Sequence, residues 1–90
     1  MTIHVSSMAG QRWRVEIRDG TPTTHDVGIP AGYLEKLGVV GVPPERVIEE
    51  SFRFLLEREP NTSILGRFDL PVIARYFPEY EREIRMRLQG

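Results

Sequence analysis

The chain has 90 residues, which is the length of one small domain, and its 40% hydrophobic and 28% charged residues exclude a disordered or bilayer-spanning chain. It contains no cysteine, which excludes disulfides, thiolate catalysis and cysteine-based metal sites. The formal net charge of −1 shows no basic excess, which disfavours strong binding to nucleic acid.

The first third of the chain predicts three antiparallel strands, at about 2–7, 11–18 and 23–29. In the second, Trp13, Val15 and Ile17 alternate with charged residues, which is typical of a strand with one buried face. Turn-forming residues separate the three segments, so we expect consecutive strands to pair.

The remaining two thirds predict helices. Residues 31–38 give about two turns, and residues 44–59 give the longest helix, with Pro44 in its first turn and Pro60 after its end. Its stripe of apolar residues predicts that it lies across the core. We expect a turn or helix at 63–67, a short helix at 70–77 capped by Asp69, and a last helix after Pro78.

Strands followed by helices indicate an α+β fold. We therefore predict a single domain over residues 1–90, in which a three-stranded antiparallel sheet is packed by the 44–59 helix and by short C-terminal helices.

The sequence carries no recognisable catalytic, cofactor-binding or metal-binding pattern. His4 and His25 lack the spacing of a metal site, and neither a phosphate-binding loop nor GxGxxG occurs. We therefore expect no enzymatic activity, no cofactor and no metal.

Residues 23–59 resemble the ribbon-helix-helix family of repressors and antitoxins, with THDVGIP as ribbon, AGYLEKLG as first helix and GVPPERVIEESFRFLLERE as turn and second helix. The resemblance implies DNA binding through the outward ribbon positions Thr24, Asp26 and Gly28. Asp26 and Glu45 would repel phosphates, and two prolines remove N–H donors from the second helix. Two shorter segments are similar to other regulators: residues 27–39 to swapped-hairpin transition-state regulators, and residues 70–88 to a helix-turn-helix.

Two groups of side chains are candidates for binding a protein partner. Arg12, Arg14 and Arg18 share the outward face of the second strand, where arginines can bind acidic groups. Tyr76, Phe77 and Tyr80 flank Pro78, where short helices cannot cover every ring, and exposed aromatic residues are common at interfaces.

These observations predict a regulatory or adaptor module that acts by protein–protein interaction without catalysis. The alternative is a DNA-binding repressor or antitoxin of the ribbon-helix-helix type. We expect self-association, as a dimer, because the core of so short a chain is small. We also expect a cytoplasmic protein without a membrane segment, since residues 1–10 lack the features of a secretory signal.

Overall fold

The first three strands form an antiparallel meander, as predicted. The computed structural model describes residues 1–89. β1 (Thr2–Met8), β2 (Arg12–Arg18) and β3 (Thr23–Gly28) pair in chain order. Trp13, Val15 and Ile17 are buried on one face, and the charged residues of β2 lie on the other. The period-two pattern of β2 therefore identified both its strand conformation and its buried face.

A fourth strand corrects the predicted sheet. β4 (Arg67–Asp69) pairs in parallel with β3, so the sheet is mixed, with strand order β1-β2-β3-β4. The turn or helix predicted at 63–67 is displaced toward the N-terminus: a 3-10 helix lies at Asn61–Ser63, bends follow at Ile64 and Gly66, and β4 begins at Arg67. β4 has only one buried residue, Phe68, and so it is too short to show an alternating pattern in the sequence.

Gly28 leaves room for an ion pair that links β4 to β2. Arg12, Gly28 and Asp69 lie next to one another on β2, β3 and β4. The Arg12 and Asp69 side chains meet over Gly28, where any Cβ atom would overlap them. Arg12 Nη1 lies 3.2 Å from Asp69 Oδ1. Asp69 therefore pairs with Arg12, and the prediction that it caps the following helix is wrong, since that helix has no side-chain cap.

Within residues 1–89 the α-helices are α1 (Tyr33–Leu37), α2 (Pro44–Leu56), α3 (Pro71–Tyr76) and α4 (Tyr80–Gln89). α2 begins where the sequence predicts and ends three residues before the predicted residue 59. After the helix the chain turns more tightly, and the N–H groups of Arg58 and Glu59 both donate to the Leu55 carbonyl. The helix cannot easily continue, because Glu59 precedes Pro60 and a residue before proline disfavours helical backbone. No helix in this described part of the chain has the length and apolar character needed to cross a membrane.

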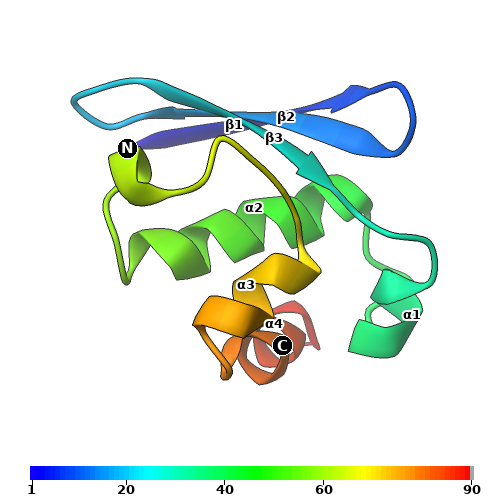
Figure 1. Ribbon diagram of the computed structural model, residues 1–90. Coiled ribbons are helices and arrows are strands. Elements are labelled where there is room, and N and C mark those ends of the chain that lie inside the picture. Colours follow the sequence, from blue (N-terminus) through cyan, green and yellow to red (C-terminus); the bar gives the residue numbers. More distant parts are fainter. Residues whose placement is uncertain (90) are drawn as a thin grey trace.

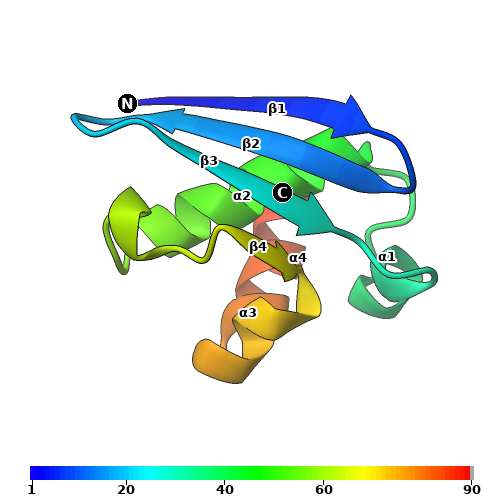
Figure 2. The ribbon, with the colours of Figure 1, turned by 45° about the horizontal axis from the view of Figure 1, so that its top comes forward.

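The helices lie on one face of the sheet (Figures 1 and 2). α2 runs beneath the strands and contacts β1 and α4, while α3 lies between β4 and α4. The face of the sheet that carries Arg14 and Arg18 is left without a covering helix.

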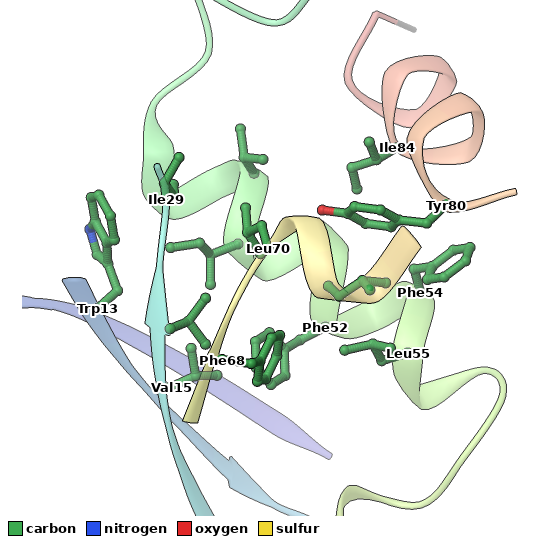
Figure 3. Close-up of a cluster of buried hydrophobic side chains, with 14 of the residues drawn as sticks. Trp13, Val15, Ile29, Phe52, Phe54, Leu55, Phe68, Leu70, Tyr80 and Ile84 are labelled. Atoms are coloured by element: carbon green, nitrogen blue, oxygen red, sulfur yellow. The ribbon is translucent and has the colours of Figure 1, made fainter. Parts of the chain in front are cut away.

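Aromatic rings on α2 link the sheet to the C-terminal helices (Figure 3). The Phe52 ring lies 5.9 Å from that of Phe68 in β4, and the Phe54 ring lies 5.3 Å from that of Tyr80 in α4. Between them, Ser51 is buried and donates to the Val47 carbonyl at 2.7 Å, so it accepts from the Tyr80 hydroxyl, also at 2.7 Å. α2 therefore packs on both layers at once.

Truncation of Phe52 tests this packing. Phe52 is fully buried, so we expect Phe52→Ala to lower the free energy of unfolding by about 3 to 5 kcal/mol, because the loss of the ring leaves a cavity. Urea denaturation measures this change. Arg14→Ala, at an exposed position, is the control and should shift stability by about 0.5 kcal/mol or less. A loss for Phe52→Ala as small as that of the control would contradict the described core.

Candidate functional site

The predicted arginine group lies on the uncovered face of the sheet, but its members differ. Arg12 Nε lies 2.6 Å from Asp26 Oδ1. This ion pair, together with the one to Asp69, raises the pKa of Arg12. Arg14 and Arg18 are exposed and form no ion pair with any described residue. The Arg12 side chain is thus paired with acids of neighbouring strands, while the Arg14 and Arg18 side chains are open to solvent.

Acidic residues interrupt this face. Asp26 and Asp69 lie beside Arg12, and Glu16 stands between Arg14 and Arg18 on β2. Arg67 adds a further cation, 3.9 Å from Asp26. The uncovered face therefore has mixed charge, without the concentrated positive charge that a phosphate-rich partner requires.

The structure separates the three aromatic candidates. Tyr76, at the end of α3, is 66% exposed, and Phe77 is half-buried beside it. Tyr80 is fully buried, and burial raises the pKa of its hydroxyl. We therefore correct the expectation for Tyr80, which belongs to the core because its ring packs on Phe54 and its hydroxyl bonds to Ser51.

Tyr76 and Phe77 border an apolar groove with a volume of about 400 Å³. We call it the α3 groove. Its walls come from the end of α2, the chain that leads into β4, β4 itself and α3. The lining residues are Leu55, Glu59, Ser63, Ile64, Leu65, Phe68, Val72, Ile73, Tyr76 and Phe77.

The α3 groove lies where two helices end. α2 ends at Leu56, before Pro60, and α3 ends at Tyr76, before Pro78. Phe68 and Leu55 form part of the floor, where they join the core (Figure 3). Leu65 is 46% exposed, and together with Tyr76 it leaves apolar surface open to solvent. Two large exposed apolar side chains beside one groove are typical of an interaction site.

Among the described residues, Glu59 is the only one with a carboxylate side chain in the wall of the α3 groove. Burial raises its pKa, and no basic side chain within residues 1–89 offsets this effect. The groove therefore combines an apolar surface with one partly buried acid. A ligand with a cationic group beside apolar groups matches this chemistry.

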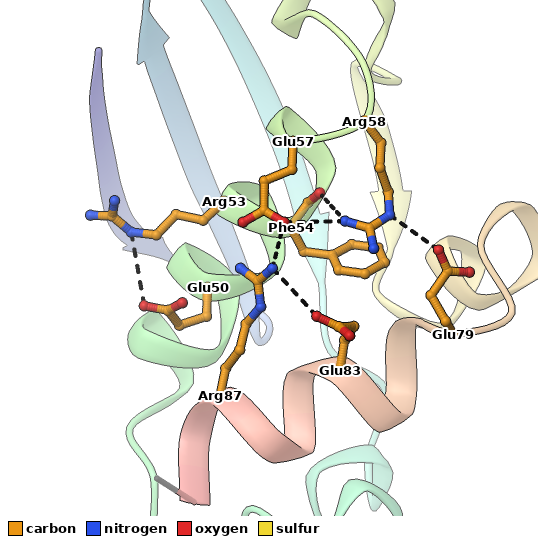
Figure 4. A network of polar contacts seen from close by, with 8 residues as sticks. All are labelled: Glu50, Arg53, Phe54, Glu57, Arg58, Glu79, Glu83 and Arg87. Carbon is orange, nitrogen blue, oxygen red and sulfur yellow. Dashed lines mark hydrogen bonds and ion pairs between the residues drawn. The ribbon is translucent and has the colours of Figure 1, made fainter.

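A network of ion pairs fixes α4 against α2 next to the groove (Figure 4). The Arg58 guanidinium lies 3.6 Å from the centre of the Phe54 ring, and its Nε lies 3.1 Å from Glu79 Oε2. Arg87 Nη2 lies 2.6 Å from Glu57 Oε1, and this pair lowers the pKa of Glu57. Arg58 and Arg87 thus join the end of α2 to Glu79 and to α4.

A second hollow, of about 460 Å³, lies between Trp13, the Pro30 loop and α1. Trp13 is mostly buried, and its indole N–H donates to Glu45 at 3.0 Å. We favour the α3 groove, because the exposed side chains of Leu65 and Tyr76 meet there beside Glu59, which forms no ion pair with any residue in 1–89.

Glu59 and Leu65 do not stand out in the sequence. Leu65 lies in the loop between the 3-10 helix and β4, and Glu59 is one of several acids in and after α2, so only the fold brings them together. No group of His, Cys, Asp and Glu within residues 1–89 could hold a metal ion. No protein-family model, curated protein or solved structure matches the chain.

The raised pKa of Glu59 predicts a dependence of stability on pH. The Glu59 carboxyl group binds its proton more tightly in the folded chain than in the unfolded chain. The protonated group therefore contributes its full stabilisation below the unfolded-state pKa, and this stabilisation is lost as the pH rises through the folded-state pKa. We expect Glu59→Gln to be more stable than the wild type near pH 7, and the two to converge in acid, as measured by urea denaturation.

Glu57→Gln is the matched control. Its partner Arg87 lowers the pKa of Glu57, so ionised Glu57 adds stability above the unfolded-state pKa and loses it as the pH falls. This variant should be less stable than the wild type near pH 7. Equal effects of both substitutions on stability would contradict the partial burial of Glu59.

Proposed function

We propose that the chain is a regulatory or adaptor module that binds a segment of a partner protein in the α3 groove and catalyses no reaction. The observation that carries the proposal is the open apolar surface formed by Tyr76 and Leu65 beside a groove of about 400 Å³. Large exposed aromatic and aliphatic side chains next to a concave surface favour binding, because the partner removes them from water.

The groove favours one kind of partner segment. Its volume accommodates a few apolar side chains, and Glu59 favours a lysine or arginine next to them. A bound cation would stabilise the ionised carboxylate, whose charge is disfavoured in the free protein. We therefore propose a short amphipathic segment with one basic residue.

DNA binding of the ribbon-helix-helix type receives less support. In that family the ribbons of two subunits pair with each other, whereas both edges of β3 are bonded here to β2 and β4. Asp26, on the outward side of β3, is engaged with Arg12. Titration of labelled duplex DNA at low salt separates the two functions, and salt-sensitive binding would favour the DNA-binding alternative.

A displayed library of random peptides tests the proposed binding. We expect peptides selected on the immobilised chain to share apolar residues and one lysine or arginine. Tyr76→Ala should weaken their binding about tenfold or more by calorimetry, because an exposed aromatic anchor is lost. Glu59→Gln should weaken the binding of the basic peptides. It should have little effect on the binding of the same peptides with glutamine in place of the basic residue.

Met86→Ala is the matched control. Met86 is 64% exposed, close to the 66% of Tyr76, and lies on α4 outside the groove. It should leave the affinity unchanged within about twofold. Equal losses for Met86→Ala and Tyr76→Ala, or failure to select any peptide, would overturn the proposed function.

A further inference from the structure

β1 is an edge strand with no protection against pairing. Within the described part of the chain it pairs with β2 alone, and its seven residues, TIHVSSM, include no Asp, Glu, Lys, Arg or Pro. The chain as a whole is 28% charged, so an uncharged strand is unexpected at an exposed edge. Its register with β2 runs without a bulge from Thr2 to Met8. Exposed edges are normally blocked by charges, prolines, bulges or short length, and β1 has none of these.

The opposite edge of the same sheet is protected. β4 has three residues, and two of them, Arg67 and Asp69, are charged and exposed. β1 also carries apolar residues on its inner side, because Ile3 and Val5 pack against the core but are only half-buried. The contrast between the two edges indicates that β1 is the one suited to pairing.

The side of α2 next to β1 carries complementary charges. α2 contacts β1, and Figure 4 shows the Arg53 side chain extending from α2 toward the β1 side of the sheet. Arg53 Nη2 lies 2.8 Å from Glu49 Oε2, one turn earlier. The strand and the helix have similar lengths, about 20 Å each from their rise per residue. Because α2 lies next to β1, a two-fold axis that pairs two β1 strands also brings together two antiparallel copies of α2.

We propose that two copies of the chain pair through antiparallel β1 strands, with the two-fold axis at Val5, into a continuous eight-stranded sheet. In this register Val5 faces its own copy, Ile3 faces Ser7 of the partner subunit, and no like charges are opposed. The free N–H and C=O groups of both edges become bonded, and the half-buried apolar residues are covered.

The α2 helices strengthen the same arrangement. The two-fold axis places them antiparallel, so Glu49 of one copy approaches Arg53 of the partner subunit, and the reverse pair forms with the roles exchanged. Opposite charges at matched positions favour a second copy over an unrelated strand. This dimer is independent of the α3 groove, which lies on the β4 side of the sheet.

The mass in solution as a function of concentration tests the dimer. Sedimentation of the chain at concentrations from about 1 to 500 µM should show a rise from the monomer mass of 10.4 kDa to twice that value. Ser7→Lys should raise the dissociation constant about tenfold or more, because an inward-pointing lysine at the edge would be buried beside Ile3 of the partner subunit. Ser7 is exposed in the monomer, so the fold should be retained, as judged by circular dichroism.

Thr24→Lys is the matched control. It adds the same charge at an exposed position of β3, away from the edge, and should leave the dissociation constant unchanged. Charge exchange gives a second measurement: Glu49→Arg and Arg53→Glu should each weaken the dimer, and the double variant should restore it. A wild-type chain that stays monomeric at every concentration overturns the proposal. The proposal is also overturned if the chain dimerises but neither Ser7→Lys nor the single charge changes weaken the dimer. Tyr76→Ala, in the α3 groove, should leave the mass in solution unchanged.

Discussion

The fold depends on one constraint, which is that the 13 residues of α2 must pack against the sheet and the C-terminal helices at once. Phe52 packs on Phe68 toward the sheet, and Phe54 packs on Tyr80 toward α4. Ser51, between these directions, fits because its hydroxyl bonds to Val47 and Tyr80. Buried polar groups are tolerated when they are bonded, and here the bond fixes the position of α4 on α2.

Long periodic segments made most of this architecture predictable. The alternation of Trp13, Val15 and Ile17 identified a strand and its inner face, and the apolar stripe of α2 identified the covering helix. β4 was not predictable, because three residues give no period and their pairing depends on β3, about forty positions earlier. The pairing of Asp69 with Arg12 depends in the same way on Gly28, whose missing side chain matters only once three strands are aligned.

The candidate site was predictable only in part. The aromatic residues around Pro78 in the sequence include Tyr76 and Phe77, both of which line the α3 groove. Tyr80 is buried instead, because it lies one turn before Ile84 on the face of α4 that packs on α2, as the spacing of these apolar residues in the sequence indicates. Glu59 and Leu65 acquire their surroundings from the turn after Pro60, and a concave surface made by three separate segments leaves no local pattern.

The two proposed surfaces lie at opposite edges of the sheet, so their occupation is compatible. The α3 groove includes Phe68 of β4, whereas self-pairing would use β1, with β2 and β3 between them. A dimer through β1 would therefore carry two α3 grooves near the two ends of an eight-stranded sheet. A partner with two suitable segments could occupy both, and the second binding event would then be intramolecular. In this arrangement self-association raises the affinity for a bivalent partner without any new contact in the groove, which is how a domain of 90 residues with one small groove could bind tightly.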